Sequence, residues 1–599
     1  MLALLFFTLP LIYWPGFLEA ASLPRYFVIG IISALGVSMW AWAAWHKSAP
    51  FVWHRSFWLI LAFFSWAAIS TAWSPDAGTS LIEISQLAGM IMLAFLGMQI
   101  ASQRRFSSWI LPTLLAGSLI TAIIGIGQHF GFNPMGFRLN EKHIAATFIN
   151  RNHAAVYFDL IIPLALIGII YFRRTKQCIL SATTAGFGIA FLLVNKSRGS
   201  LLAFVTALLV FLIIVVTNKP FRQLVVERLL PKRRYLAIVL VLPLLVSILP
   251  STSEQQAKWD TRLLEQKVDS NTKFRLNAYI NTLPLIIQQP LTGSGYGGFR
   301  MSFRPNATNI KPLVWLTENS VVGALHNDPL QYLVELGLPG FTLVVLIFFT
   351  ALRNAWPPPE PRNDPDKEFL KFGLLLAIVA AGVHACVDFP LHLPCSAALF
   401  WFFLGSLLGL TAKTTQAIAI SPLLQKLLFG TGLGLLLFTL GFYFQYFQGS
   451  HNLYIATARI QKNDCPAAIA AIESSFSAFS LNYVTQNRYA QIYTLCNLPV
   501  ETKLQAMDLV LAYDPTNVRA RLTRGALYLE QRNVSEAEKD LLYVVDILPH
   551  RPLAYLGLGD AAVLKHDYSA ARHYYSAGLK RDPNNSYARD MLHKLHAVN

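Results

Sequence analysis

The chain has 599 residues, of which 54% are hydrophobic and only 14% charged, and its formal net charge is +17. This composition is too apolar for a soluble protein of this size and places the chain among polytopic membrane proteins. No soluble basic module accompanies the positive charge, so nucleic-acid binding is not expected.

Apolar runs of about 20 residues recur from Met1 to about Phe447. Each must be a helix, because a chain that crosses lipid has to satisfy its own backbone hydrogen bonds. The first run lacks a positively charged start, so we expect a retained helix and not a cleaved signal peptide. The length rule predicts about 12–13 transmembrane helices, at approximately 2–18, 26–45, 56–73, 82–101, 108–130, 154–172, 178–194, 200–217, 235–250, 329–352, 368–388, 394–411 and 423–447.

Basic residues concentrate in alternate connections between these runs, as at 173–176 and 232–234. By the positive-inside rule, this alternation predicts a cytoplasmic N-terminus and an external C-terminal region. We therefore expect a membrane domain at 1–447 with external loops at 131–153 and 251–328, followed by an external domain at 450–599.

The tail contains a repeat of about 34 residues, in which Gly525, Ala537 and Pro549 recur as Gly559, Ala571 and Pro583. The pattern resembles the tetratricopeptide repeat, whose stacked helix pairs form a concave surface for a peptide or a partner protein. A helical cap without a ligand is the alternative. Cys465 and Cys496 also lie in this tail, where a disulfide is permitted, but the sequence leaves their pairing open.

Polar clusters at membrane depth are costly and therefore indicate function. The predicted topology places four of them on the external side. The first contains Asn150, Asn152 and His153 at the start of a helix, as a donor-rich rim for a sugar or diphosphate; the alternative role of Asn152 is to cap that helix. The second contains Lys196 and Arg198 between two helices, where a helix N-terminus and fixed positive charge suit a diphosphate. Snorkelling of these side chains to the headgroups is the alternative.

The third cluster contains Arg275, the glycine-rich segment 293–298, His326 and Asn327. The glycines are not followed by the Lys-Ser/Thr of a Walker loop, and His326 is a candidate general base at the water–lipid boundary. The fourth cluster is the turn with Asp388 and His392, in which Asp388 could orient a histidine, pair with an arginine or serve ordinary turn chemistry. No metal is expected, since no H-E-x-x-H motif or clustered cysteines occur.

Five motifs together resemble the O-antigen ligase superfamily over roughly residues 60–410. They are Thr147–Ala154, Ser197–Gly199, Pro290–Gly295, His326–Asp328 and Glu335–Gly340. The superfamily comprises ligases that join O-antigen to lipid A-core, O-antigen polymerases and bacterial protein O-oligosaccharyltransferases. The turn 388–392 together with the repeat-bearing tail resembles a subgroup linked to exopolysaccharide or lipopolysaccharide assembly.

The resemblance implies an all-α, GT-C-like membrane transferase of the bacterial inner membrane that works without a metal or cofactor. Its donor would be a glycan on undecaprenyl diphosphate. The family's essential histidine and membrane-edge arginine match His326 and Arg198, and a second basic position matches Arg275 less securely. Arg198, Lys196 and Arg275 would bind the donor diphosphate, and His326 would activate the acceptor hydroxyl.

The acceptor is left open. A ligase acting on lipid A-core or a related surface glycan is favoured over a polymerase that extends the lipid-linked glycan, and over a protein O-oligosaccharyltransferase. A transporter of the lipid-linked glycan would favour inverted repeats, and no convincing internal symmetry is present. A non-catalytic assembly scaffold would tolerate loss of His326 and Arg198, whereas an enzyme would not.

Overall fold

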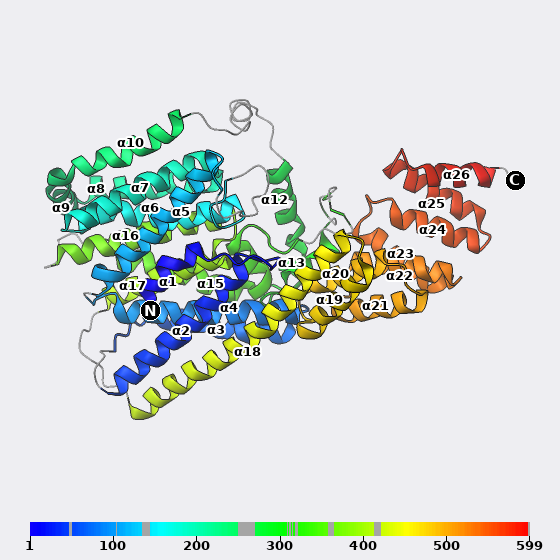
Figure 1. The fold of residues 1–599 in the computed structure, drawn as a ribbon, viewed down its shortest axis with the longest axis horizontal. Helices are drawn as coiled ribbons and strands as arrows, with labels where there is room; N and C mark the ends of the chain where they lie inside the picture. The colour runs from blue at the N-terminus through cyan, green and yellow to red at the C-terminus, as the bar shows by residue number, and fades with distance from the viewer. Residues whose placement is uncertain are drawn as a thin grey trace.

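The computed structural model describes residues 1–46, 51–103, 105–133, 144–249, 270–307, 310, 313, 316–317, 322–356, 364–412 and 421–596. Within these residues the secondary structure consists of helices, and no β-strand occurs. A large bundle that contains the N-terminus and a smaller stack that ends at the C-terminus follow one another along the long axis (Figure 1). The predicted all-α fold with a helical-repeat region is confirmed.

Ten of the described helices are long and apolar enough to span a membrane. They are α2 (Ser22–Trp45), α4 (Ala77–Ile100), α5 with the turn before it (Phe106–His129), α6 (Arg151–Tyr171), α7 (Thr175–Asn195), α8 (Arg198–Thr217), α15 (Asp328–Ala355), α16 (Pro365–Ala385), α17 (Pro394–Thr411) and α18 (Pro422–Gln461). Shorter apolar helical segments occupy the other three predicted positions: α1 with the turn after it (Leu2–Leu11), α3 with the turn after it (Phe57–Trp73) and α10 (Arg234–Ile248). Every predicted span thus contains a helix.

The first predicted span, 2–18, is too long. The helical segment ends at Leu11, and the chain then turns back toward α2. The carbonyl groups of Pro10 and Ile12, which have no helical partner at this break, accept hydrogen bonds from the guanidinium of Arg25 at 2.9 and 3.1 Å. This buried arginine replaces the missing helical hydrogen bonds, so the break is part of the packed core.

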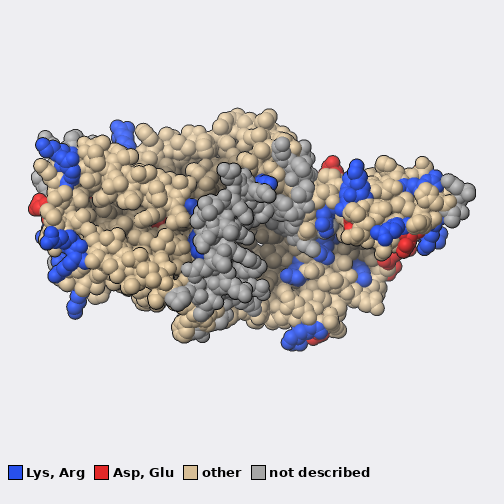
Figure 2. Space-filling view, turned by 90° about the horizontal axis from the view of Figure 1, so that it is seen from above, with Lys and Arg blue, Asp and Glu red and all other residues tan. Residues whose placement is uncertain are grey.

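The outer surface of the bundle has the character of a lipid-facing surface. Large apolar side chains remain exposed along α8, α10 and α18, among them Leu209, Leu240 and Phe444. On the face shown in Figure 2, Lys and Arg gather at the end of the bundle farthest from the repeat stack and again on the stack, and few charged residues are drawn on the bundle surface next to that end. An apolar belt between charged ends is expected of a multi-pass membrane protein.

Several helices lie in connections that the sequence predicted as loops. The amphipathic helix α9 (Lys219–Leu229) joins α8 to α10, and the long connection before α15 contains α12 (Ser270–Asn281), α13 (Leu283–Gln288) and α14 (Phe299–Phe303). These helices are too short or too polar to resemble spans, so hydropathy does not reveal them. Residues 134–143 and 250–269 of the two predicted external loops lie outside the described residues.

The C-terminal stack consists of eight helices, each packed against the next. They are α19 (Cys465–Ala478), α20 (Tyr483–Leu495), α21 (Val500–Tyr513), α22 (Val518–Glu530), α23 (Val534–Ile547), α24 (Leu553–Leu564), α25 (Tyr568–Arg581) and α26 (Ser586–His596). The recurring glycines lie where helices approach closely: a Cβ on Gly559 would be 2.6 Å from the ring of Tyr575, and one on Gly525 would be 3.1 Å from Leu541. The 34-residue period therefore reflects helix packing.

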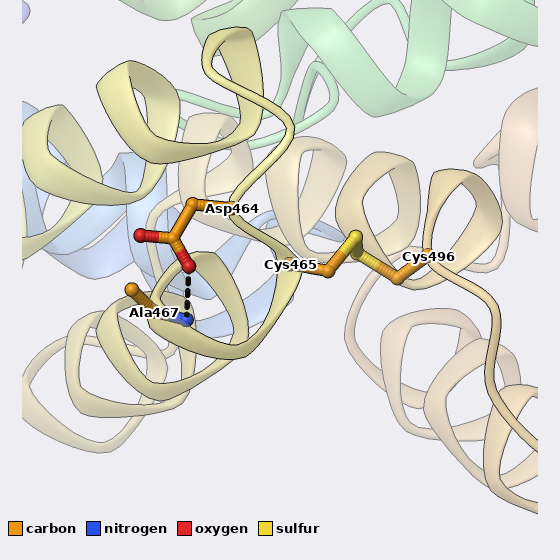
Figure 3. The surroundings of a disulfide bond; sticks show 4 residues. All are labelled: Asp464, Cys465, Ala467 and Cys496. Atoms are coloured by element: carbon orange, nitrogen blue, oxygen red, sulfur yellow. Dashed lines mark hydrogen bonds between the residues drawn. A yellow bond between two sulfur atoms is a disulfide. The ribbon is translucent and has the colours of Figure 1, made fainter.

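The last span leads into this stack without a loop, because α18 is continuous from Pro422 to Gln461. Immediately afterwards, Cys465 at the start of α19 forms a disulfide with Cys496 at the end of α20, with a Cα–Cα distance of 5.7 Å (Figure 3). The pairing that the sequence left open is thus present, and it clamps the first two helices of the stack.

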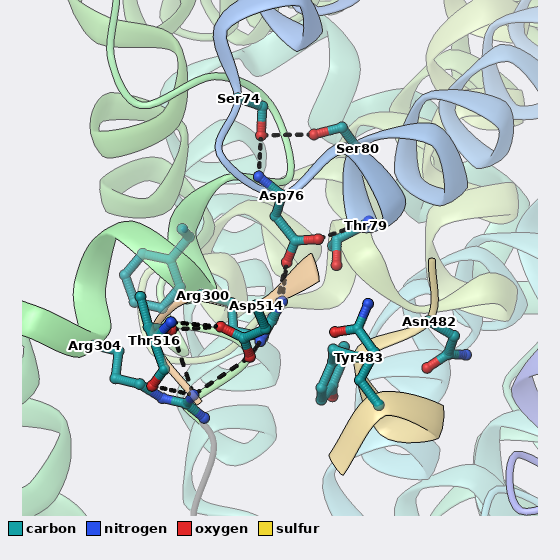
Figure 4. A network of polar contacts seen from close by, with 12 residues as sticks. Ser74, Asp76, Thr79, Ser80, Arg300, Arg304, Asn482, Tyr483, Asp514 and Thr516 are labelled. Atoms are coloured by element: carbon teal, nitrogen blue, oxygen red, sulfur yellow. Dashed lines mark hydrogen bonds and ion pairs between the residues drawn. The ribbon is translucent and has the colours of Figure 1, made fainter. Parts of the chain in front are cut away.

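A buried ionic network fixes the stack to the bundle (Figure 4). Arg300, on α14, lies 2.7 Å from Asp76 at the start of α4 and 2.8 Å from Asp514 between α21 and α22. Arg304 also contacts Asp514, at 3.4 Å, and the ring of Tyr483 lies 4.6 Å from the Arg300 guanidinium. Burial would raise the pKa of Asp514, but the two guanidinium groups outweigh it and lower the pKa below its usual value.

Candidate active site

A basic cavity of about 450 Å³ lies where α6, α8, α12 and the turn after α16 meet. Its lining includes four cationic side chains, those of Arg151, Lys196, Arg198 and Arg275. Arg198 opens α8, and Lys196 before it has the left-handed conformation, with φ 63°, that ends α7. A helix N-terminus surrounded by four cations is suited to an anion such as a diphosphate.

His326 and Asp388 form a hydrogen-bonded pair beside this cavity. Nδ1 of His326 lies 2.8 Å from Oδ1 of Asp388. His326 has φ 56°, a left-handed conformation that is costly for a side chain of this size, and its carbonyl accepts a hydrogen bond from Tyr279 at 2.8 Å. The backbone therefore holds the imidazole in an orientation that a relaxed loop would not maintain.

Three further groups surround the carboxylate of Asp388. Arg275 lies 3.4 Å from Oδ2 and also donates to the carbonyl of Val387, while Asn152 donates to Oδ2 at 3.1 Å. Burial would raise the pKa of Asp388, but the hydrogen bond and charge of His326 together with the charge of Arg275 lower it to about 2. Asp388 is consequently an anion that can fix the tautomer of His326 and leave its Nε2 free to accept a proton.

The two asparagines of the first polar cluster have different roles. Asn150, not Asn152, caps α6, since its side chain accepts the backbone N–H of Asn152 at 2.9 Å. Asn152 is thereby available for Asp388. His153 lies against Phe389, with ring centroids 5.7 Å apart, and the same phenyl ring lies 4.7 Å from His326.

Asn327 and His392 join the two segments that carry His326 and Asp388. Asn327 caps α15 through Leu330 and donates to the carbonyl of Cys386 at 2.9 Å. Nδ1 of His392 lies 2.7 Å from Asp328, which also accepts the backbone N–H of Leu391. Neither Asn327 nor His392 lines the basic cavity.

A buried polar group beside the basic cavity was not predicted from the sequence. Nδ1 of His384 on α16 lies 2.6 Å from Asp159 on α6, and Ser200 on α8 donates to the same carboxylate at 3.0 Å. A Cβ on Gly199 would lie 2.9 Å from Nε2 of His384, so glycine is required beside Arg198. The available signal was Asp159, an acidic residue within the apolar helix α6.

The glycine-rich segment is a packing element. Ser294 and Gly295 donate to the carbonyls of Val334 and Glu335, where α15 is interrupted at Gly337 with φ 64°. A Cβ on Gly293 would lie 2.4 Å from the backbone of Glu335. The glycines thus permit close backbone contact between the loop and the interrupted helix.

A second cavity, of about 600 Å³, also reaches His326. Its lining includes Glu83 of α4, Arg300 of α14 and Phe389. Tyr483 of the repeat stack also belongs to this lining. His326 and Phe389 belong to this lining, while Arg275 and Asp388, which contact His326, line the basic cavity. The imidazole therefore stands between two cavities of different character.

Residues 183–345 match the family model described as O-antigen ligase. This match supports the resemblance to O-antigen ligases over that part of the chain. The match contains Lys196, Arg198, Arg275 and His326, while Asn152 and Asp388 lie outside it.

A comparison with curated proteins found no match. Among solved structures, a chain in the crystal structure of the APC/C hetero-tetramer Cut9–Hcn1 is similar at 11% identity. The alignment covers 87% of this chain and 90% of that chain, with a TM-score of 0.24. A likeness this weak supports no conclusion about this chain.

Proposed function

We propose that this protein is a glycosyltransferase of the ligase type that moves a glycan from undecaprenyl diphosphate to an acceptor hydroxyl. The observation that carries the proposal is the position of the His326–Asp388 pair at the edge of a cavity with four cationic side chains. The O-antigen ligase match across this region supports the same class. Residues 1–447 would form the transferase domain, with residues 450–599 as the repeat domain.

The diphosphate of the donor would occupy the basic cavity. As the bond between the anomeric carbon and the phosphate oxygen breaks, negative charge develops on the leaving diphosphate, and Arg198, Lys196 and Arg275 stabilise it as fixed donors. Arg151 adds a fourth cation that the sequence analysis did not single out. A lipid-linked diphosphate leaves readily, so a strong acid is not required.

The polyprenyl chain would follow α8 into the membrane. Leu202 lines the basic cavity, and the next turns of α8, with Phe204, Leu208 and Phe211, line an apolar cavity of about 200 Å³ whose other wall is mainly α6. A basic cavity followed by an apolar cavity along the same helix suits a lipid diphosphate better than a soluble nucleotide sugar.

The acceptor would approach from the second cavity. Its hydroxyl attacks the anomeric carbon, Nε2 of His326 takes the hydroxyl proton, and the imidazolium is stabilised by Asp388. Phe389 and Tyr483 offer aromatic surfaces on which sugar rings stack. The proton later passes to solvent or to the released diphosphate, which completes the exchange of one C–O bond for another.

We favour lipid A-core or a related surface glycan as the acceptor. A polymerase that adds to the lipid-linked glycan would use the same residues. A protein acceptor gains support from a groove of about 1010 Å³ along the repeat stack, lined by Leu522, Ala526, Leu556 and Asp560 among others. A concave repeat surface of this kind accommodates an extended polypeptide or a partner protein.

The protein would reside in a bacterial inner membrane, with its N-terminus in the cytoplasm and its repeat domain in the periplasm. Basic side chains at the end of the bundle opposite the stack support this orientation (Figure 2). The disulfide between Cys465 and Cys496 supports an oxidising compartment for the stack.

The test is reconstitution of the purified protein with an undecaprenyl diphosphate-linked glycan and each acceptor class in turn. We expect glycan attached to lipid A-core or a surface glycan, with release of undecaprenyl diphosphate. A lengthened lipid-linked glycan would identify a polymerase, and glycosylated polypeptide a protein transferase. If a folded sample transfers to none of them, the proposed function is wrong.

A further inference from the structure

Three titratable side chains from distant parts of the sequence converge beside the segment that carries Asp388. They are Glu83 on α4, Glu335 on α15 and His392 in the short turn Pro390–His392 before α17. One ligand atom of each lies within 4.8 Å of the others. Glu335 is 1% exposed, and the side chain of His392 is 12% exposed.

Each of these three side chains has one buried polar atom with no hydrogen-bond partner within the described part of the chain. They are Oε2 of Glu83, Oε2 of Glu335 and Nε2 of His392. Buried polar atoms almost always have a partner, and an unpaired buried carboxylate is costly. Three such atoms on side chains whose ligand atoms come within 4.8 Å of one another indicate that something else binds among them.

The other polar atoms of Glu335 and His392 are already fixed. Oε1 of Glu335 accepts hydrogen bonds from the backbone of Phe299 and from Gln331, at 3.3 and 3.4 Å. Nδ1 of His392 lies 2.7 Å from Asp328. A histidine whose one nitrogen is bonded to a carboxylate presents the lone pair of its other nitrogen, which is the usual arrangement of a metal-binding imidazole.

We propose that Glu83, Glu335 and His392 bind a divalent transition-metal cation, with Asp328 orienting the imidazole. Two carboxylate oxygens and one imidazole nitrogen form a mixed ligand set that suits Zn²⁺ or Mn²⁺ better than the all-oxygen shells of Mg²⁺ and Ca²⁺. Metal–ligand bonds of about 2.0–2.2 Å put ligand atoms at most about 4.4 Å apart, so small side-chain rotations close the site. Water from the second cavity, which Glu83 lines, would complete the coordination.

The ion would have a positioning role. None of its three ligands lines the basic cavity, so it would not touch the diphosphate. It would instead tie α4 and α15 to the turn that also carries Asp388, the residue bonded to His326. The site does not depend on the proposed transferase function, because it rests on the three ligands alone.

The experiment measures bound metal in the full chain, purified in detergent without a histidine tag. After chelator treatment, Zn²⁺, Mn²⁺ and Mg²⁺ are titrated separately, and bound ion is counted by mass spectrometry. We expect one Zn²⁺ or Mn²⁺ per chain, which also raises the thermal unfolding midpoint, and no comparable uptake of Mg²⁺. Glu83→Gln and Glu335→Gln, which nearly preserve shape, should each abolish stoichiometric binding, whereas the exposed Glu536→Gln should bind as the wild type does.

Asp328→Asn tests the orienting carboxylate, since such second-layer changes weaken metal affinity by about 10–100-fold. Folding of every variant is checked by circular dichroism and size exclusion. The absence of a stoichiometric ion in the wild type, or full binding in both glutamine variants, would overturn the proposal. In that case Glu83 and Glu335 would be protonated instead of binding a metal ion. No transfer reaction is measured, so either result leaves the proposed function to its own test.

Discussion

Nδ1 of His326 lies 2.8 Å from Oδ1 of Asp388, although 62 residues separate them in the chain. Asp328, two residues after His326, pairs with His392, four residues after Asp388, so the histidine and the carboxylate have exchanged segments. The loop before α15 and the turn before α17 are therefore joined by two histidine–carboxylate pairs. The first of these pairs borders both cavities.

Asp388→Asn should lower kcat for glycan transfer much more than it changes KM for the donor. With a pKa of about 2, Asp388 is ionised at neutral pH, and the substitution removes the charge that stabilises a protonated His326. Steady-state kinetics with the lipid-linked donor measures this split. Asp508→Asn, in an exposed ion pair of the repeat domain, is the matched control and should leave both constants unchanged. A normal kcat in Asp388→Asn would remove Asp388 from the mechanism.

Arg198→Ala should reduce kcat by about 10²–10³-fold, which is the usual effect of deleting one donor that stabilises developing negative charge. Arg198→Lys should recover part of the loss, because the charge returns without the planar guanidinium. Arg174→Ala, at the opposite end of α7, removes an exposed arginine outside the basic cavity and serves as the control. Equal effects of Arg174→Ala and Arg198→Ala would show that only general surface charge matters.

Asp514→Asn should weaken attachment of the repeat domain to the bundle. The change leaves the buried Arg300 and Arg304 with one anion fewer, and breaking such a buried pair costs about 3–5 kcal/mol. Hydrogen–deuterium exchange in α14 and α21 should increase in the variant. Protection equal to that of the wild type would mean that the network contributes nothing to attachment.

The same network predicts a pH dependence. Because the folded-state pKa of Asp514 is lowered, its stabilisation is fully present above about pH 4 and is lost as the pH falls further. Thermal unfolding of the wild type should therefore become less cooperative or shift downward in that acid range. Asp514→Asn should lack this part of the acid response, and an identical profile would contradict the assignment.

Reduction of the Cys465–Cys496 disulfide should destabilise the first helices of the stack. The bond closes a loop of 31 residues, for which chain entropy predicts about 3–4 kcal/mol. Denaturant unfolding of the repeat region, followed with and without a reducing agent, measures the effect. The double variant Cys465→Ser/Cys496→Ser should be insensitive to the reducing agent, and an insensitive wild type would contradict the prediction.

Hydropathy and repeat spacing were enough to predict the helical bundle and the repeat stack, because lipid burial and helix packing leave local periodic patterns. They failed where contacts with distant residues decide the structure. The first helix ends at Leu11, because Arg25 donates a hydrogen bond to a carbonyl group at the break. The candidate residues Lys196, Arg198 and His326 were recognisable because polar groups are rare at the ends of apolar helices, whereas Arg275 lies in a polar helix and was indicated by the family resemblance.

Long-range pairing was beyond sequence reasoning. Nothing local indicates that Asn152 would bond to Asp388 while Asn150 caps the helix, since both asparagines suit either role. The group formed by Glu83, Glu335 and His392 is equally hidden, because its members are scattered across the chain and follow no metal-binding motif. The pairing of Asp159 with His384 has the same origin in tertiary packing.

The central claim is that His326 acts as the base in transfer of a glycan from a lipid diphosphate. The most direct measurement is the single-turnover rate of undecaprenyl diphosphate release in the presence of acceptor, for wild type, His326→Ala and the exposed control His573→Ala. We expect His326→Ala to be slower by at least about 10²-fold, the usual contribution of a general base, with donor binding retained and the control unchanged. A wild-type rate in folded His326→Ala would contradict the account.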